Sequence, residues 1–258
     1  MPSWGIGWDV FCWIGQRRFS RHWSVPQIRN ELRDSYDLKL SDDAIEDHIA
    51  TYQNMVAARQ QDPQELASVY RDSSELVLTI DGLQPEKAHE TLYMVREVTR
   101  NRVLFAEPLL SGATDEIRKL IEEFQSFSED KTLQAMAKVK ASFQVGLFAG
   151  SDLTDYPHDN LDLERWFRLP KSHERRIHGH KHAGIRIVRE GATLIPTLDA
   201  HAQHPGVFTE QDLVEFSTAT TPASQLASQQ PHGVMQKSRS KKTNRTPKTI
   251  GVANPQSQ

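Results

Sequence analysis

The sequence predicts an α+β fold, and three observations carry that prediction. Helical spacing of apolar residues occupies much of the first 72 positions, three short runs of strand-forming residues follow between residues 76 and 106, and a helical pattern comes directly after them. The stretch 217–258 is rich in Ser, Thr, Gln, Pro and Lys and predicts a disordered tail. We therefore divide the chain into a helical segment at 1–72, a mixed segment at 73–216 and a tail at 217–258.

Composition narrows the class of protein. The chain has 258 residues, of which 37% are hydrophobic and 25% charged, as expected for a soluble protein with a modest core. No apolar run reaches the length of a membrane span, and the segment Met1 to Trp13 lacks the basic region of a signal peptide. We therefore expect no membrane partner and a cytoplasmic location. The single cysteine, Cys12, excludes an internal disulfide and a cysteine-only zinc site.

Charge is unevenly distributed along the chain. The net charge of −3 hides basic clusters at 165–189 and at 237–248. Such asymmetry indicates contact with nucleic acid, although a solvated surface is the simpler interpretation of any one cluster.

The helical segment predicts two short helices joined by a tight turn. Ser24 can cap the first and Ser41 the second, with a turn through Tyr36-Asp37-Leu38 between them. The second helix has an amphipathic stripe at i, i+4, i+7 and i+11, formed by Ile45, Ile49, Tyr52 and Val56. A pair of this kind is typical of a helix-turn-helix that places its second helix in a DNA groove, and also of an ordinary helical hairpin.

The charges around this pair indicate which of its residues could contact phosphates. Asp43, Glu46 and Asp47 lie on the exposed side of the predicted second helix, where they would repel phosphates. Basic residues before it are better phosphate contacts, and we single out Arg17, Arg18, Arg21, Arg29 and Arg33. On this pattern alone, DNA binding and a plain hairpin weigh about equally.

The mixed segment predicts three strands and then helices. The apolar run 76–80 suits a central strand that ends before a turn at Asp81-Gly82, and 91–98 and 103–106 suit the next two. A helix at 114–124 would leave one face of the sheet open, so another strand is expected to follow. The later predictions are a helix at 132–143, one around 163–167 that ends at Pro170, a short strand at 185–188 and a short helix at 209–216.

Two acids are candidates for metal-dependent chemistry on a phosphodiester. Asp81, at a rigid strand end, is one; Glu164 is the other. Mg²⁺ prefers carboxylate oxygens, and paired Mg²⁺ ions clamp the attacking and leaving oxygens. The simpler interpretations are a turn-forming Asp-Gly and a Glu164–Arg168 pair at i, i+4. Near Glu164, four arginines are candidate phosphate contacts: Arg165, Arg168, Arg175 and Arg176.

Three alternating histidines follow: His178, His180 and His182. On a strand they would share one face and could bind zinc. Gly179 and the interleaved bases favour a loop that contacts phosphate or backbone instead.

The chain resembles bacterial insertion-sequence transposases with the Asp-Asp-Glu triad. The resemblance rests on Trp13 to Phe19, on Leu78 to Tyr93, and on Asn160 to Phe167 with His173 to Arg176, and it covers most of 13–208. It implies an N-terminal helix-turn-helix, an RNase H-like catalytic domain and Mg²⁺-dependent cutting and joining of DNA. The implied partner is DNA carrying the element's terminal inverted repeats, and a homo-oligomer fits the same pattern. Asp81 matches the first acid and Glu164 the last, so the resemblance makes both of them metal ligands.

The departure from that family concerns the second acid. In the family it follows the next strand, in a stretch resembling Ser-Asp-Lys-Gln, whereas here Asp81 and Glu164 are only 83 positions apart (164 minus 81) and no such stretch appears. Asp130, Asp152 and Asp155 lie between them, but none follows a strand-like run. The chain thus resembles an internally deleted, RNase H-like transposase, and we expect it to lack strand transfer. The alternatives are a DNA-binding protein that interferes with a full-length transposase and a non-functional pseudogene product.

Overall fold

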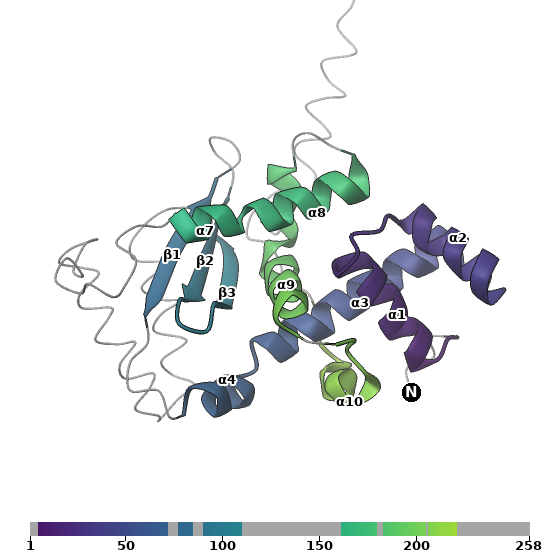
Figure 1. The fold of residues 1–258 in the computed structure, drawn as a ribbon, viewed down its shortest axis with the longest axis horizontal. Coiled ribbons are helices and arrows are strands. Elements are labelled where there is room, and N and C mark those ends of the chain that lie inside the picture. The colour runs from purple at the N-terminus through teal and green to yellow at the C-terminus, as the bar shows by residue number, and fades with distance from the viewer. Residues whose placement is uncertain are drawn as a thin grey trace, which may run out of the picture.

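A computed structural model describes residues 5–71, 77–84, 90–109, 161–179, 183–204 and 206–220. It is a mixed structure of helices and one antiparallel sheet, with the sheet at one end and the N-terminal helices at the other (Figure 1). The predicted helices at 114–124 and 132–143 lie outside the described residues, as do the tail from 221 and the three intervening aspartates. No helix within the described ranges is both long and apolar enough to cross a membrane.

The N-terminal helices begin and end where their capping residues predict. They are α1 (Trp8–Phe19), α2 (Val25–Tyr36) and α3 (Asp42–Gln60), followed by α4 (Pro63–Tyr70). The backbone N–H of Ser24 donates to Gln27 Oε1 at 2.8 Å, and Ser41 Oγ accepts from the N–H of Ala44 at 3.2 Å. Asp37 ends α2 in the left-handed conformation with φ of 51°. The predicted turn and both predicted caps are confirmed.

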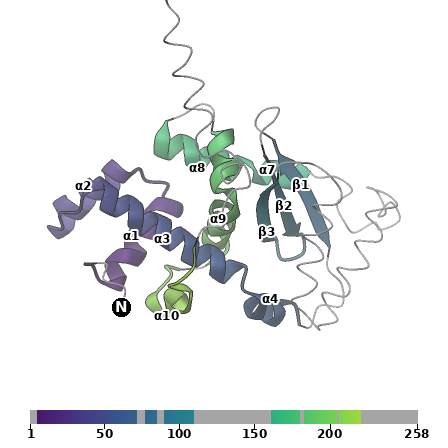
Figure 2. The same cartoon turned by 180° about the vertical axis from the view of Figure 1, so that it is seen from behind.

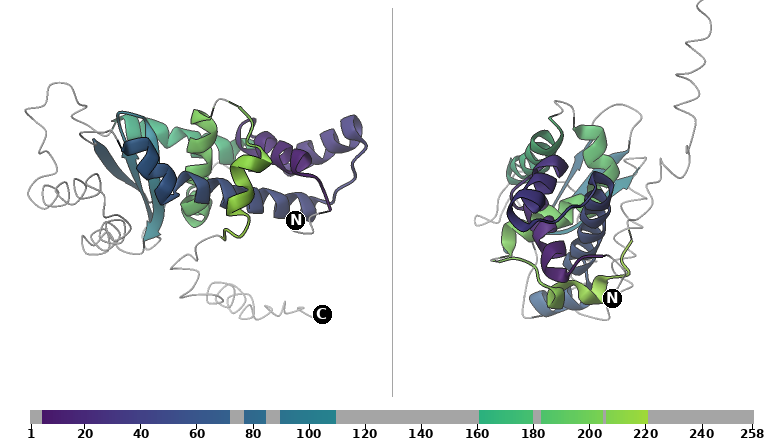
Figure 3. Two further views of the ribbon diagram at one scale, coloured as in Figure 1. Left: turned by 90° about the horizontal axis from the view of Figure 1, so that it is seen from below. Right: turned by 90° about the vertical axis from the view of Figure 1, so that its right-hand side faces the viewer.

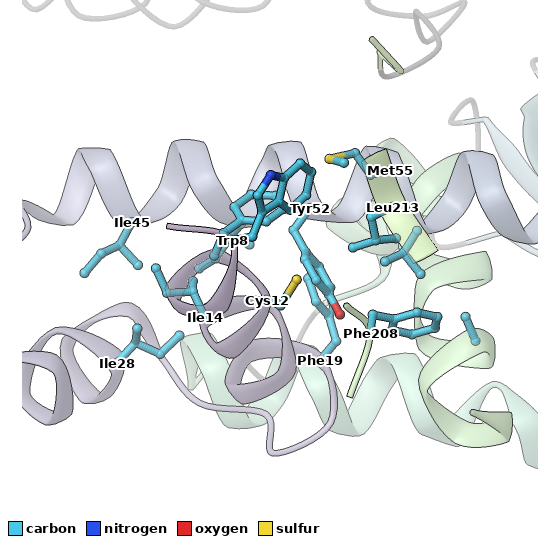
Figure 4. Close-up of a cluster of buried hydrophobic side chains, with 14 of the residues drawn as sticks. Trp8, Cys12, Ile14, Phe19, Ile28, Ile45, Tyr52, Met55, Phe208 and Leu213 are labelled. Atoms are coloured by element: carbon cyan, nitrogen blue, oxygen red, sulfur yellow. The ribbon is translucent and has the colours of Figure 1, made fainter. Parts of the chain in front are cut away.

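The predicted stripe of α3 forms the centre of the first hydrophobic core. Its residues pack with buried residues of α1 and α2, among them Phe11, Ile14 and Ile28. Figure 4 labels Ile14 and Ile28 together with Ile45 and Tyr52 of the stripe. Gly15 lies against the ring of Tyr52, so any side chain at position 15 would collide with it. Residues from the far end of the chain complete the same core: Leu194, Leu198, Phe208 and Leu213. The core therefore crosses the predicted boundary between residues 72 and 73.

The sheet has three antiparallel strands in the order β1-β2-β3. They are β1 (Leu78–Leu83), β2 (Thr91–Glu97) and β3 (Arg102–Leu109). The prediction that the first strand ends before Asp81 is wrong: Asp81 pairs with Met94, and Gly82 pairs with Tyr93. The strand continues because β2 offers a backbone ladder beyond the apolar run, which no property of the Asp-Gly pair reveals.

Helices cover both faces of the sheet in the described structure. They are α4 on one face, and α7 (Leu161–Trp166) and α9 (Gly184–Gln203) on the other, with α8 (Arg168–His178) running from α7 towards α1 (Figures 1 and 2). The α9 face has a core of Leu92, Met94, Val103, Ala106, Leu163, Phe167, Ile187, Val188 and Ile195. The α4 face has a smaller one of Leu66, Tyr70, Val95 and Leu104. Helices thus cover both faces among the described residues, and the further strand that we expected after residue 124 falls outside them.

Two predictions in the C-terminal part are wrong, and a third is confirmed. Ile185 to Val188 is not a strand but the first turns of α9. Pro170 does not end a helix; it lies in the first turn of α8, where its missing N–H costs no hydrogen bond. The short helix at 209–216 is present as α10 (Glu210–Leu213) and the 3₁₀ turn η1 (Val214–Phe216).

Helix α9 joins the two ends of the molecule. It lies between the sheet and the N-terminal helices, and every residue from Gly191 to Ala200 is buried (Figure 3). Asp199 fixes its position: its Oδ2 accepts from the N–H of Val103 at 2.9 Å, Gln60 Nε2 at 3.0 Å and Gln203 Nε2 at 2.9 Å. One buried carboxylate therefore links β3, α3 and α9.

Candidate nucleic-acid interface

The exposed side of α8 is a stripe of positive charge. Arg168, Lys171 and Arg175 follow one another at i, i+3 and i+7, with Arg176 beside them, and all four are exposed. Within the described residues none of the four has an ion-pair partner. At a rise of about 1.5 Å per residue the stripe is roughly 10 Å long. We call these four residues the α8 stripe. Lys171 was not among the predicted contacts, although its helical spacing from Arg168 and Arg175 is visible in the sequence.

Helix α8 packs against the end of α1, which brings two distant basic segments together. His22 Nδ1 lies 2.9 Å from His173 Nδ1, and Arg18 Nη2 lies 3.4 Å from His178 Nε2. The ring of His173 stacks on Phe19, with 5.6 Å between ring centroids. Arg21 directly precedes His22 and is exposed, so an accessible cation lies next in sequence to this contact.

Beneath the stripe lies a buried network of polar side chains. Glu174 is 2% exposed and lies 3.3 Å from Arg186 Nε, and Arg186 in turn lies 3.1 Å from Glu190. Burial of Glu174 raises the pKa of its carboxyl, while the charge of Arg186 acts in the opposite direction. Arg189 also lies 3.4 Å from Glu190, so these groups and Arg18 make three cations and two anions.

Two imidazoles of this network, those of His173 and His22, have lowered pKa values that favour the neutral form. Burial, followed by the charge of Arg18, lowers the pKa of His173 to about 2. Burial, followed by the charge of Arg176, lowers the pKa of His22 below its ordinary value. A proton on either ring would add an uncompensated charge next to the arginines.

Of the five predicted arginines in the N-terminal segment, only Arg21 is both exposed and without an ion pair among the described residues. Arg18 is corrected from a phosphate contact to a buried structural residue: it is 6% exposed and donates to the backbone oxygen of Trp23 at 3.1 Å. Arg29 is paired with Asp42 at 2.9 Å, and Arg33 with Asp34 at 2.7 Å.

Arg17 is half-buried between two indole rings. Its guanidinium carbon lies 4.8 Å from the ring centroid of Trp13 and 5.3 Å from that of Trp23. These cation–π contacts hold the side chain against the protein surface, so Arg17 is less free than Arg21 to meet a phosphate.

The predicted arginines on α7 and α8 are all exposed: Arg165, Arg168, Arg175 and Arg176. Helix α3 has the opposite charge on its exposed side, where Asp43, Glu46 and Asp47 are solvent-accessible. The charge of a DNA backbone thus favours contact with α8 over contact with the first turns of α3.

The two candidate catalytic acids lie on neighbouring elements. Asp81 is opposite Met94 in the ladder, so it is on the sheet face that α7 covers, and α7 packs against β1. Its carboxylate accepts from the N–H of Gly82 at 2.7 Å. Glu164 is exposed, between the buried residues Leu163 and Phe167. In the part of the chain that the structure describes, no three acidic, histidine or cysteine side chains gather to hold a metal ion.

The alternating histidines do not begin a strand. His178 is the last residue of α8, and Gly179 ends the helix with a φ of 69°. His178 lies 3.9 Å from Glu174 and bonds with Arg18, so it belongs to the buried network. His180 and His182 lie outside the described residues.

A comparison of the chain with protein-family models, curated proteins and solved structures finds no match in any of the three.

Proposed function

We propose that this chain is a DNA-binding protein descended from an insertion-sequence transposase of the Asp-Asp-Glu type, and that it does not catalyse strand transfer. The observation that supports DNA binding is the α8 stripe, which presents four exposed cations on one helix, and the segment that holds the exposed Arg21 contacts the same helix through His22. Exposed cations gathered in this way attract the closely spaced phosphates of a duplex and release its counterions.

The origin of the chain is proposed from its motifs together with the position of its acids. Asp81 lies in β1, and Glu164 lies in the helix that packs against β1, which is compatible with a reduced RNase H-like domain. The loss of strand transfer is proposed because the sequence offers no match to the second acid. A two-ion centre needs a shared set of carboxylates, and one missing ligand disables it.

The distribution of charge predicts which part of the DNA is contacted. The exposed acids of α3 repel a backbone, so a helix-turn-helix that inserts the start of α3 into the major groove is not part of the proposal. Contacts from α8 reach phosphates, which carry no sequence information. We therefore expect the element's terminal inverted repeats and an unrelated duplex of equal length to bind with similar affinity.

Fluorescence anisotropy with both duplexes over a range of salt concentrations tests the binding half. The expected result is a linear fall of log K with log salt concentration, with a slope of about −4 for four to five phosphate contacts. Absence of binding at low salt would refute this half. A strong preference for the terminal repeats would instead mean that a helix of this protein reads bases in the major groove.

Incubation of repeat-bearing DNA with Mg²⁺ and the full chain tests the catalytic half. We expect neither cleaved nor joined products. Product that disappears in the Asp81→Ala variant would show that the centre is intact and that this half of the proposal is wrong.

A further inference from the structure

Two imidazoles meet where α1 and α8 join. His22 Nδ1 and His173 Nδ1 are 2.9 Å apart, so one ring donates a proton to the other. His22 holds a left-handed backbone conformation with φ of 57°, which is uncommon outside glycine. Such a conformation persists when surrounding contacts determine it, and it aims the ring of His22 at His173.

The environment of His173 decides which ring donates. Its other nitrogen, Nε2, is buried and has no hydrogen-bond partner. A buried N–H without an acceptor is costly. The positive charges of Arg18 and Arg186 also act on this ring and oppose a proton on Nε2. We therefore expect Nε2 of His173 to be unprotonated. The proton of neutral His173 therefore sits on Nδ1 and is donated to His22 Nδ1.

This assignment fixes the tautomer of His22. With Nδ1 accepting, neutral His22 carries its proton on Nε2. His22 is half-buried, and its Nε2, unlike that of His173, is not a buried atom lacking a partner. The charge of Arg176 lowers the pKa of His22, and the exposed Arg21 directly precedes His22 in the sequence.

We propose that His22 is a phosphate-binding residue that acts as a neutral Nε2–H donor, and that His173 is the positioning residue that fixes this tautomer. The ligand is a phosphate oxygen of the DNA backbone, held also by Arg21 and Arg176, so the inference rests on the proposed DNA binding. Below the site the buried Glu174 and the partly exposed Glu190 both pair with Arg186, while His178 bonds with Arg18. Arg21 and Arg176 have no ion-pair partner among the described residues, so their charges are available to neutralise the phosphate.

The tautomer can be read on the full chain without any ligand. Imidazole ¹⁵N NMR at neutral pH distinguishes a protonated from an unprotonated ring nitrogen. We expect the His22 proton on Nε2 and the His173 proton on Nδ1. A His22 proton on Nδ1 would overturn the assignment, whatever the protein binds.

DNA affinity separates a neutral donor from a cation. His22→Asn keeps a residue that tolerates the left-handed conformation but removes Nε2–H, and we expect binding about five- to tenfold weaker. The salt slope should not change, because a neutral donor releases no counterion. Arg176→Gln is the matched control, since it should lower the slope by about 0.9. Wild-type affinity for His22→Asn, or a change in slope like that of Arg176→Gln, contradicts the proposal.

Substitutions of His173 test its positioning role. His173→Asn can present an N–H near the position of Nδ1, whereas His173→Leu cannot. We expect His173→Leu to bind DNA as weakly as His22→Asn and His173→Asn to bind within about twofold of the wild type. Equal affinity of the two variants, each checked for folding by thermal melting, assigns His173 a structural role only.

Failure of DNA binding and failure of this inference can be told apart. If the wild-type chain does not bind duplex DNA, titration with inorganic phosphate still probes the site through the His22 Nε2 signal. A phosphate-dependent shift of that signal, absent in His173→Leu, supports the site without DNA. No shift at any phosphate concentration that leaves the protein folded overturns it.

Discussion

Helices α3 and α8 both bury one face and expose the other, but they differ in what each face contains. The buried face of α3 is mainly hydrocarbon, and its exposed first turns are acidic. The buried face of α8 carries His173 and Glu174, and its exposed face carries only cations among its charged residues. Apolar packing fixes α3, whereas α8 is positioned in part by polar contacts that weaken when their charge balance changes. The difference separates a helix that supports the fold from a helix suited to binding a polyanion.

Removal of the α8 stripe should have the largest effect. We expect the variant with Arg168, Lys171, Arg175 and Arg176 all replaced by Gln to bind duplex DNA at least about a thousandfold more weakly near 0.1 M salt, with the salt slope reduced by about 3.6. Anisotropy measures both. The matched control is Arg29→Gln with Arg33→Gln, whose cations are already paired with aspartates and should matter by less than about threefold. Equal losses in the two variants would remove the distinction between α8 and the N-terminal helices.

Truncation of the α3 core should lower stability without touching the DNA surface. Tyr52 is fully buried and its hydroxyl bonds with His201 Nε2 at 3.0 Å. We expect Tyr52→Ala to lower the free energy of unfolding by about 3–4 kcal/mol, measured by urea titration. Tyr52→Phe should lose only about 1 kcal/mol, since it removes one hydrogen bond. A changed DNA affinity in the folded Tyr52→Phe protein would mean that α3 takes part in binding.

Acidification should lower the free energy of unfolding through two buried imidazoles, one beside α8 and one beside α3. Burial lowers the pKa of His173 beside α8 to about 2 and that of His201 beside α3 to about 4, from a usual value of 6.5. Stability is therefore complete above pH 6.5 and declines as the pH falls towards 4, because the unfolded chain binds the protons. Asp199 opposes this: burial raises its pKa to about 6, which adds stability as the pH falls through 6.

Between pH 7.5 and pH 5 the free energy of unfolding should fall by roughly 2–3 kcal/mol in total. Chemical denaturation at each pH measures this loss. His173→Phe and His201→Phe should each flatten the profile, and His173→Phe should do so further below pH 4. A profile that neither variant alters would place the titrating groups elsewhere.

Neutralising the acids of α3 should have the smallest effect. With Asp43, Glu46 and Asp47 replaced by amides, we expect DNA affinity to rise by no more than about threefold, because exposed charges remote from the bound phosphates are largely screened. Anisotropy against the same duplex checks this. A rise of tenfold or more would mean that α3 lies close to the bound DNA, so that α3 and α8 would differ less in their roles.

Local signals in the sequence predicted the N-terminal helices because caps and periodicity both lie within a few residues. Ser24, Ser41 and the stripe from Ile45 to Val56 needed no knowledge of the rest of the chain. The start of α9 was mistaken for a strand at Ile185 to Val188 because three of these four residues are β-branched. Ile185 is also 46% exposed, so an apolar residue stands where an amphipathic helix would show a polar one.

The candidate site was predictable only in part, for a related reason. The arginines of α8 stand out in the sequence by their charge, and Lys171 could have been added by helical spacing. The burial of Arg18 and the pairing of His22 with His173 depend on a contact between residues 151 positions apart. No local pattern encodes such a contact, so those two features required the structure.

The position of α9 has a consequence for the order in which the protein can be made. The N-terminal helices are synthesised first, yet their core lacks Leu194, Leu198, Phe208 and Leu213 until the last part of the described chain has emerged. A nascent chain that has passed α3 but not α9 carries an apolar surface with nothing to cover it, which is the condition under which chaperones bind and aggregation begins. Because the closing contacts span well over a hundred residues, the first helices made are among the last to be secured.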